Sequence, residues 1–313
     1  MTITQLQYVL AVAEHKNFTL AAEKCFVTQP TLSMQIQKIE DELNILIFDR
    51  SKKPIQLTEI GQKIVNQAKN IVNEAGRIKD IVEQQKGFIG GEFRLGIIPT
   101  IMPTLLPMFL TNFIKKYPKI KLIIEELNTD EIILKLKNGH LDAAIAATPL
   151  MEEKLKEIVL YFEPFVAYVP QNNSIAEKGE IEVNDLNLDD ILLLQDGHCF
   201  RDGILNLCKN QNYSNTNSFQ LESGSFETLI RLADEGLGTT LLPYLHTLEL
   251  KEKDKLKLRH FKEPKPAREV SLVFPKTELK IHIIEALRQT IVGVIKGAIV
   301  FQNVQIISPI SKK

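Results

Sequence analysis

The chain has 313 residues, of which 44% are hydrophobic and 25% are charged. This length and composition describe a globular protein of roughly two or three domains and exclude a disordered tail, a collagen-like fibre and a disulfide-stapled miniprotein. The formal net charge is only -1, so any polyanionic partner has to be met by a local basic patch. No apolar run is long enough to span a membrane, and the first residues lack the basic and apolar segments of a signal peptide. We therefore expect a cytoplasmic protein.

The first part of the chain predicts three short helices followed by a hairpin. Apolar residues recur at helical spacing over residues 4–15, and Thr19 can cap a second helix. A third helix begins near Pro30 and repeats Leu or Ile every three or four positions. Two short alternating runs flank the basic segment 50–54 and predict a hairpin wing with a basic tip. Basic and acidic side chains are equal in number over residues 1–58, so charge alone does not indicate DNA binding.

The polar face of the third helix carries short amide and hydroxyl side chains near the helix N-terminus. Side chains of this kind reach base edges and phosphates when a helix enters the major groove of DNA. The alternative is that the helices and the hairpin only pack together and that this face is solvated. The face carries Gln29, Thr31, Ser33, Gln35 and Lys38.

Four strings in this region form a specific pattern: Phe18-Thr19-Leu20-Ala21-Ala22-Glu23, Thr28-Gln29-Pro30-Thr31-Leu32-Ser33, Ile36-Gln37-Lys38-Ile39-Glu40-Asp41-Glu42-Leu43 and Leu57-Thr58-Glu59-Ile60-Gly61. The pattern resembles the winged helix-turn-helix of LysR-type transcriptional regulators. The resemblance implies sequence-specific binding to double-stranded promoter DNA, with residues 29–38 as the recognition helix and the wing on the DNA backbone. The DNA-binding residues that it implies are Gln29, Pro30, Thr31, Ser33, Gln35, Lys38, Arg50, Lys52 and Lys53.

A long helix is predicted from Thr58 onward, because apolar residues follow at alternating steps of four and three. A period of 3.5 residues favours a coiled-coil seam and therefore a dimer. The alternative is a helix that packs against its own domain. A dimer also suits DNA, because two recognition helices can then meet two half-sites. The seam consists of Ile64, Ala68, Ile71, Ala75, Ile78 and Val82.

The remaining two-thirds of the chain alternate between strands and helices, which predicts two α/β lobes. The chain is predicted to cross between the lobes near residues 163–165 and 267–269, leaving an interlobe cleft of the kind in which α/β sheets bind ligands. The predicted strands are 93–98, 120–126, 141–146, 165–169, 191–194, 219–222, 238–242 and 270–274, and the predicted helices are 103–117, 130–138, 227–235 and 277–297.

The expected fold class is α+β multidomain, and the LysR resemblance implies a two-lobed, periplasmic-binding-protein-like regulatory domain. No dinucleotide-binding fingerprint, P-loop, nucleophile elbow or HExxH zinc motif is present. We therefore expect a protein that is not an enzyme and that needs no cofactor and no metal. The expected domains are a DNA-binding domain (1–58), a linker and dimerisation helix (59–86), a hinge (87–91), lobe I (92–163 and 268–300), lobe II with the redox cysteines (164–267) and a tail (301–313).

Two of the three cysteines, Cys199 and Cys208, are nine positions apart. They form a redox couple, half of a metal site or two unrelated thiols; metal is the weakest of these, because no second Cys/His cluster accompanies them. Cys25 faces inward on its helix and is expected in the core. Asp196 and Gly197 indicate a turn, so we expect Cys199 to begin the helix that carries Cys208. A helix N-terminus and nearby cations promote the reactive thiolate.

Helix geometry implies that a disulfide between Cys199 and Cys208 would change the conformation of the chain. Nine helical steps separate the two Cα atoms by roughly 13 Å, whereas a disulfide tolerates only about 7 Å. Oxidation would therefore unwind the helix. The expected sequence is attack of the Cys199 thiolate on a peroxide to give a sulfenic acid, followed by attack of Cys208 to form the disulfide.

Further strings surround these cysteines: Asp196-Gly197-His198-Cys199 with Arg201-Asp202, Gly96-Ile97-Ile98-Pro99-Thr100, Ser225-Phe226-Glu227-Thr228-Leu229 and Thr240-Leu241-Leu242-Pro243. They resemble the hydrogen-peroxide-sensing members of the LysR family. The resemblance implies a homotetramer, with RNA polymerase and a thiol reductant of the glutaredoxin or thioredoxin type as partners. One departure is Ser218, where related proteins often carry His, which puts in doubt a water relay that needs imidazole there. The peroxide pocket implied beside Cys199 consists of Thr100, Thr129, His198 and Arg268.

Two other functions stay open at this point. One is a LysR-type regulator that binds a small organic effector in the interlobe cleft, with Ser223, Ser225 and Thr100 as anion-binding groups at helix N-termini. The other is a thiol peroxidase. Peroxide-dependent turnover with a reductant would favour the peroxidase, whereas stabilisation by a ligand with both thiols intact would favour the effector-binding regulator.

Overall fold

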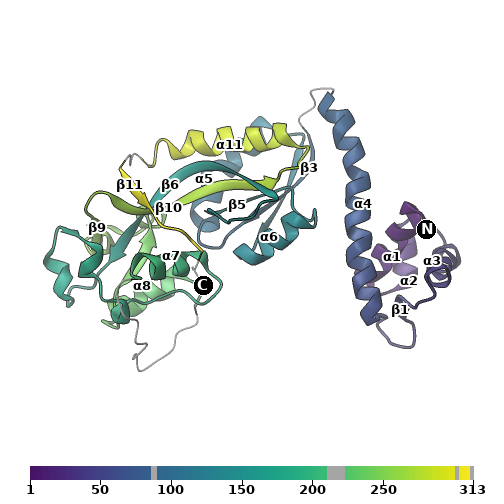
Figure 1. Ribbon diagram of the computed structural model, residues 1–313, viewed down its shortest axis with the longest axis horizontal. Helices are drawn as coiled ribbons and strands as arrows, with labels where there is room; N and C mark the ends of the chain where they lie inside the picture. Colours follow the sequence, from purple (N-terminus) through teal and green to yellow (C-terminus); the bar gives the residue numbers. More distant parts are fainter. Residues whose placement is uncertain (86–89, 210–222, 300–302, 311–313) are drawn as a thin grey trace. The chain divides into compact units, whose positions relative to one another are not determined.

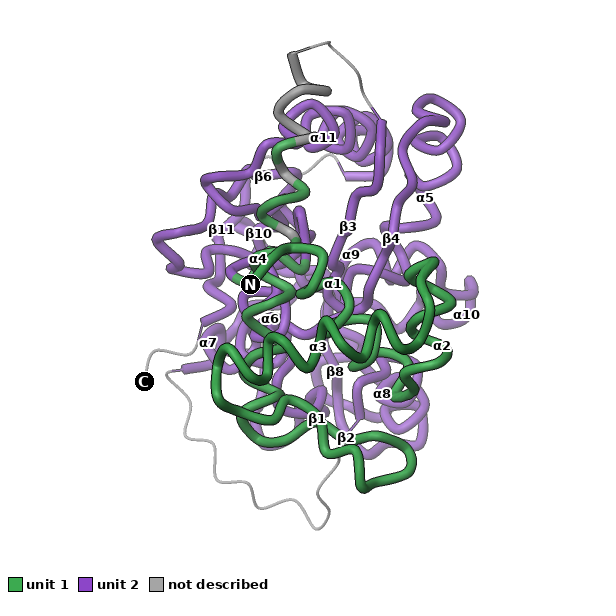
Figure 2. Tube along the Cα trace, turned by 90° about the vertical axis from the view of Figure 1, so that its right-hand side faces the viewer, with its two compact units in different colours: residues 1–88, 138–140 green, residues 89–137, 141–313 purple. Residues whose placement is uncertain are grey.

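The structure, a computed structural model, describes residues 1–85, 90–209, 223–299 and 303–310. The chain divides into two compact units (Figure 2). The N-terminal unit comprises Met1–Phe88 with Asn138–His140, and the C-terminal unit comprises Ile89–Lys137 and Leu141–Lys313.

The N-terminal unit is a winged helix-turn-helix, as predicted. Each helix begins at a side chain that satisfies free backbone N–H groups. Thr2 and Thr28 accept hydrogen bonds from the first turns of their helices. The second helix is capped by Asn17, whose side chain accepts from the backbone N–H groups of Thr19 and Leu20, and not by Thr19 as expected. The elements are α1 (Ile3–His15), α2 (Phe18–Lys24), α3 (Gln29–Leu43), β1 (Phe48–Asp49), β2 (Gln56–Leu57) and α4 (Glu59–Gln85), with β1 and β2 antiparallel.

The first half of α4 packs against its own unit. Val65 and Ala68 are each only 2% exposed and lie in the core that α1, α2 and α3 build, and Ile64 and Ile71 border that core. Positions 64, 68 and 71, predicted to form a seam for a second chain, therefore pack at least in part against α1 of their own unit. Ile78, farther along the helix, is 65% exposed. The side chain of Val82 lies outside the described residues.

The C-terminal unit is built on a mixed sheet with the strand order β4-β3-β5-β10-β6-β9-β7. Figure 1 labels β3, β5, β10, β6 and β9 of this sheet. β3 is parallel to β4 and β5, as expected of an α/β lobe, whereas β10 is antiparallel to both β5 and β6. Strand β11 adds to β10, and β8 adds to β6. The strands are β3 (Gly91–Ile97), β4 (Ile120–Glu126), β5 (Ala143–Thr148), β6 (Leu155–Tyr168), β7 (Glu180–Ile181), β8 (Thr240–Pro243), β9 (Leu258–Phe261), β10 (Lys265–Pro275) and β11 (Val304–Ile306).

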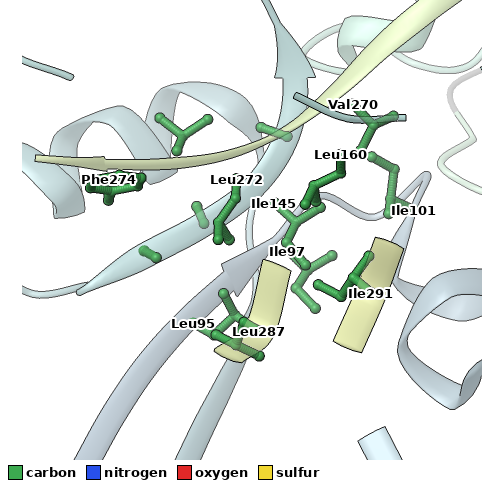
Figure 3. Close-up of a cluster of buried hydrophobic side chains, with 14 of the residues drawn as sticks. Leu95, Ile97, Ile101, Ile145, Leu160, Val270, Leu272, Phe274, Leu287 and Ile291 are labelled. Atoms are coloured by element: carbon green, nitrogen blue, oxygen red, sulfur yellow. The ribbon is translucent and has the colours of Figure 1, made fainter. Parts of the chain in front are cut away.

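Two separate apolar cores give this unit its two lobes. In the first core, side chains of β3, β5, β6 and β10 meet α11, where Leu287 and Ile291 are fully buried (Figure 3). The second core lies around Phe165, Phe200 and Phe226. Strands β6 and β10 continue through both lobes, so they form the two crossings. The helices are α5 (Met102–Lys116), α6 (Thr129–Lys137), α7 (Cys199–Leu207), α8 (Phe226–Asp234), α9 (Tyr244–Leu248), α10 (Glu252–Lys255) and α11 (Ile281–Ile295), with short 3-10 turns at Ser174–Glu177, Val183–Asp185 and Leu188–Asp190.

Three strand predictions need comment. The strand predicted at 165–169 starts earlier, at Leu155, because residues 155–164 pair with β10 although they lack a clear alternating pattern. The strand predicted at 191–194 is wrong, since Ile191 makes only a single bridge with Thr239. The strand predicted at 219–222 lies outside the described residues.

Candidate redox site and DNA interface

The helix α7 carries one cysteine at each end. His198 is its N-cap, Cys199 is its first residue, and the Cys208 N–H closes the last turn on the Ile204 carbonyl. The predicted helix between the cysteines is therefore confirmed. Both cysteines are free thiols, 6% and 1% exposed. Nine helical steps place their Cα atoms about 13 Å apart, well beyond the reach of a disulfide at about 7 Å.

The two sulfurs are buried in different apolar cores. Cys199 lies in the first apolar core and Cys208 in the second. Burial raises the pKa of the Cys208 thiol to about 11. Joining the sulfurs thus requires more than local rotation, because at least one must leave its core and α7 must open.

The Cys199 thiol has a raised pKa. Burial is the largest cause, and the charge of Asp202 adds to it, whereas Arg268, the Thr129 hydroxyl and a backbone hydrogen bond from Ala147 lower the pKa. We expected the helix N-terminus and a nearby cation to favour the thiolate. Arg268 does lower the pKa of Cys199 as a nearby cation should, but removal of the sulfur from water outweighs this charge, so the net shift is upward.

Thr129 begins α6 beside the sulfur. Its hydroxyl oxygen is buried and has no partner of hydrogen-bonding geometry among the described residues. It nevertheless lies near enough to Cys199 to lower the pKa of the thiol. A buried hydroxyl without a partner can donate to or accept from a small polar ligand.

Arg268 is held in a buried network. Its Nε and Nη2 donate to Oε2 of Glu163 at 2.9 and 2.7 Å, and the two side chains are 3% and 1% exposed. Its Nη1 donates to the Thr100 hydroxyl at 2.8 Å, and its Nη2 also donates to the Thr100 carbonyl at 3.0 Å. The network thus joins β10, β6 and the end of β3. Sequence reasoning missed Glu163, although it lies in the predicted crossing 163–165 and a buried arginine there needs an anion.

His198 completes the group of residues predicted around Cys199. It is only 8% exposed, and burial lowers the pKa of its imidazole despite the opposing charge of Glu126. A neutral imidazole can both donate and accept a hydrogen bond. A Cβ atom at Gly224 would lie 3.2 Å from His198 Nε2, so a side chain at this position would press against the imidazole.

Other residues singled out from the sequence are engaged elsewhere. The Nε atom of Arg201 pairs with Asp196 at 2.8 Å, so this guanidinium is not free to serve Cys199. The Ser225 hydroxyl donates to the Glu227 carboxylate at 2.7 Å, which places a negative charge where an anionic effector was expected. Ser218 lies outside the described residues.

The chain's last described segment binds α7, which the sequence did not predict. Asn206 Nδ2 donates to the carbonyl oxygens of Ser308 and Ile310, each at 2.9 Å. Ile307 directly follows β11. Its side chain is 8% exposed and lies in the second core, and its backbone N–H donates to the carbonyl oxygen of Ala267 at 2.8 Å. The segment therefore connects the redox helix with the strand that carries Arg268.

In the N-terminal unit, α3 exposes most of the predicted DNA-binding side chains. Ser33 and Gln35 are half-buried, and Gln35 accepts a hydrogen bond from Gln5 at 3.0 Å. The predicted residues that are exposed are Gln29, Pro30, Thr31, Lys38, Arg50, Lys52 and Lys53.

Arg50 has a structural role besides its exposure. It pairs with the buried carboxylate of Glu40 at 2.9 Å and lies over the ring of Phe18. The other oxygen of Glu40 accepts from the backbone N–H groups of Ile47 and Phe48 at the start of the wing. Arg50 therefore attaches the wing to α3.

Within the part of the chain that the structure describes, no group of three or more His, Cys, Asp or Glu side chains is arranged to hold a metal ion. In the same residues, no helix is both long enough and apolar enough to cross a membrane.

Comparison with known proteins gives a consistent result along the chain. The family of bacterial regulatory helix-turn-helix proteins of the lysR type matches residues 3–62, and the LysR substrate binding domain matches residues 86–295. The hydrogen peroxide-inducible genes activator of Pectobacterium carotovorum subsp. carotovorum is 34% identical over 274 residues, covering 88% of this chain and 90% of that protein. The DNA-binding transcriptional dual regulator OxyR of Escherichia coli (strain K12) is 32% identical over 297 residues, covering 94% and 97%.

Solved structures agree. Full-length OxyR from Pseudomonas aeruginosa is 34% identical and superposes with a TM-score of 0.74, covering 93% of this chain and 97% of that one. A hydrogen peroxide-bound OxyR mutant of Corynebacterium glutamicum is 27% identical with a TM-score of 0.64, covering 97% and 98%. Because both family matches and these relatives extend over nearly the whole length, the chain belongs to the LysR family of transcriptional regulators, in the branch that contains the OxyR proteins.

Proposed function

We propose that this protein is a hydrogen-peroxide-sensing, sequence-specific DNA-binding transcriptional regulator that is switched by a Cys199–Cys208 disulfide. The observation that carries the proposal is the placement of two buried free thiols at opposite ends of α7. A bond between them is incompatible with an intact helix, so oxidation becomes a change of shape. The names of the relatives, hydrogen peroxide-inducible genes activators, support the choice of oxidant.

The chemistry uses one peroxide for each disulfide. The Cys199 thiolate attacks one oxygen of H₂O₂, the O–O bond breaks, and the sulfur becomes a sulfenic acid while the leaving hydroxide takes a proton to form water. The Cys208 sulfur, as thiolate, then attacks the Cys199 sulfur, and the sulfenic hydroxyl leaves with a proton as a second water. Two thiols are thereby oxidised by two electrons, and peroxide is reduced to two waters.

Four side chains are suited to bind the peroxide beside Cys199. The Thr100 oxygen accepts from Arg268, so its own O–H remains available as a donor. The Thr129 hydroxyl is buried without a partner among the described residues, and the His198 imidazole is neutral. Arg268 supplies positive charge near the oxygen that develops negative charge as the O–O bond breaks.

The N-terminal unit supplies DNA recognition. In this proposal α3 enters the major groove of promoter DNA with Gln29, Thr31 and Lys38, and the exposed Lys52 and Lys53 of the wing contact the backbone. The polar contacts of Ser33, Gln35 and Arg50 with their neighbours hold this surface in position.

The remaining assignments complete the proposal. The protein functions in the cytoplasm as a dimer or tetramer, and RNA polymerase and a glutaredoxin- or thioredoxin-type reductant are its partners. Its proposed parts are a DNA-binding domain (1–58), a linker and dimerisation helix (59–86), a hinge (87–91), lobe I (92–163 and 268–300), lobe II (164–267) and a tail (301–313). Residues 87–89 of the hinge and residues 301–302 and 311–313 of the tail lie outside the described residues.

The test combines thiol mapping with DNA footprinting. Reduced full-length protein is treated with less than one equivalent of peroxide, its thiols are mapped by mass spectrometry, and a promoter footprint is recorded in parallel. We expect a 199–208 crosslink together with a changed footprint. Cys199→Ser should abolish both changes while DNA binding persists, and Cys208→Ser should stop at the sulfenic acid. Cys25→Ser is the matched control and should respond like the wild type. A Cys199→Ser protein that still switches would refute the proposal.

A further inference from the structure

Glu163 is a deeply buried carboxylate that the proposed mechanism does not use. It lies on β6 directly opposite Arg268 on β10 in the strand register. One of its oxygens accepts both hydrogen bonds from Arg268, and the other accepts the backbone N–H of Leu245 at the start of α9 at 2.9 Å. Glu163 therefore connects the Arg268 guanidinium to the start of α9.

Arg268 is fixed on three sides by this arrangement. Besides Glu163, it contacts Thr100 through two hydrogen bonds, and its guanidinium carbon lies 5.1 Å from the ring centre of Phe200. Phe200 follows Cys199 directly in α7. A displacement of Arg268 would thus change its contacts both with the Thr100 hydroxyl, which is proposed to bind peroxide, and with the helix that carries the Cys199 sulfur.

Glu163 also cancels the charge of Arg268. Two opposite charges 2.7 Å apart act at a distance as a dipole, so the sulfur of Cys199 experiences only part of the positive charge. The other titratable groups around the pair do not replace this effect. Burial and the Glu163 charge raise the pKa of Tyr161 and leave it neutral, and burial lowers the pKa of His246. Among the charges that act on Cys199, Arg268 lowers the pKa of the thiol and Asp202, on α7, raises it.

We propose that Glu163 is a positioning residue of the redox site, which holds Arg268 against Thr100 and, by opposing its charge, limits how strongly Arg268 favours the Cys199 thiolate. The ion pair then limits the reactivity of the thiol as well as stabilising the fold. The role of Glu163 in peroxide sensing rests on the proposed function. Its effect on the acidity of the Cys199 thiol does not depend on that function. A purely structural ion pair would leave the acidity of Cys199 unchanged.

A charge cycle tests the proposal in the full-length reduced protein. The rate of alkylation of Cys199 by iodoacetamide is measured against pH, with each cysteine resolved by peptide mass spectrometry. Glu163→Gln leaves the Arg268 charge unopposed and should lower the apparent pKa of Cys199 by about one unit or more. Arg268→Gln leaves a lone carboxylate and should raise it by a similar amount. The double variant is neutral and should return to within about half a unit of the wild type.

If the two single variants shift the apparent pKa of Cys199 in opposite directions and the shifts cancel in the double variant, the effect is electrostatic. Single variants that shift the pH profile in the same direction, or a folded Glu163→Gln protein with an unchanged profile, would overturn the proposal. If Glu163→Gln does not fold, the comparison of Arg268→Gln with the double variant decides, because removing the carboxylate must then lower the apparent pKa again. Glu163→Asp keeps the charge and serves as the conservative control. Should the pH profiles shift as expected while peroxide leaves Cys199 reduced, the peroxide function fails and the role of Glu163 remains.

Discussion

Cys199 and Cys208 terminate the same helix, yet their sulfurs lie in different apolar cores. The helix is therefore both the spacer that keeps the thiols apart and the structure that must be lost when they join. Because the first two residues of the helix, Cys199 and Phe200, also border Thr129 and Arg268, the loss of the helix changes contacts in both cores.

Unwinding of α7 is directly measurable by hydrogen exchange. Oxidation with one equivalent of peroxide should remove the protection of the amides in residues 199–208, because their helical hydrogen bonds cannot coexist with a disulfide of about 7 Å reach. Mass spectrometry of that peptide before and after oxidation is the measurement. Cys208→Ser should keep its protection in the presence of peroxide, and equal protection in reduced and disulfide-bonded wild type would contradict the expected unwinding.

Strengthening α7 should slow the switch. Gly203 lies inside the helix with room for a methyl group, since a Cβ there would be 3.4 Å from Phe165. Gly203→Ala should stabilise the helix by roughly 0.5–1 kcal/mol and slow disulfide formation roughly twofold to fivefold, while sulfenic acid formation keeps its rate. Quenched-flow mass mapping separates the two steps. Gly293→Ala in α11, where a Cβ meets nothing within 4 Å, is the matched control and should leave both rates unchanged.

The buried Cys208 thiol predicts a loss of stability at high pH. Its pKa is raised from 9.0 to about 11, so below pH 9 both the folded and the unfolded chain carry the proton and its contribution is complete. As the pH rises from 9 to about 11, the unfolded chain releases the proton more readily than the folded chain, which favours unfolding by about 2 kcal/mol. Denaturant titrations of the reduced protein measure this. Cys208→Ser should lose less stability over that interval, and a parallel decline in the two proteins would contradict the assignment.

Two basic residues of the wing should behave differently when removed. Arg50→Ala leaves the buried Glu40 carboxylate without its cation and should reduce the free energy of unfolding by about 1–3 kcal/mol. Lys53→Ala removes an exposed charge and should leave stability unchanged, but should lower the salt dependence of DNA binding by about one unit of slope. Chemical unfolding and anisotropy titrations at several salt concentrations give both quantities. An Arg50→Ala protein as stable as the wild type would show that the pair with Glu40 contributes nothing.

The contact between Asn206 and the end of the chain should respond to the state of α7. Asn206→Ala removes two hydrogen bonds to Ser308 and Ile310 and should weaken the attachment of this segment by about 1 kcal/mol. Faster trimming by a carboxypeptidase is the expected readout, and oxidised wild type should be trimmed faster as well. Asn303→Ala, which removes one exposed hydrogen bond to Glu263, is the control and should have a smaller effect. Identical trimming of all four samples would argue against a dependence on α7.

The sequence by itself determined the features that depend on neighbours a few residues apart. The turn at Asp196 and Gly197 predicts a helix that begins at Cys199, and the nine-residue spacing predicts that the thiols are too far apart to join. The winged helix-turn-helix and the alternation of strands and helices follow in the same way from caps and apolar periods.

Only the tertiary structure decided what depends on segments far apart. Arg268 meets Glu163 across 105 residues and Thr100 across 168, and no local pattern encodes either contact. The raised pKa of Cys199 and the packing of Ala68 against its own unit likewise depend on which surfaces exclude water around them. Helix caps and apolar periodicity depend on residues within one or two helical turns of each other. Burial and ion pairing depend on the assembled cores, and they set the acidity of the thiols.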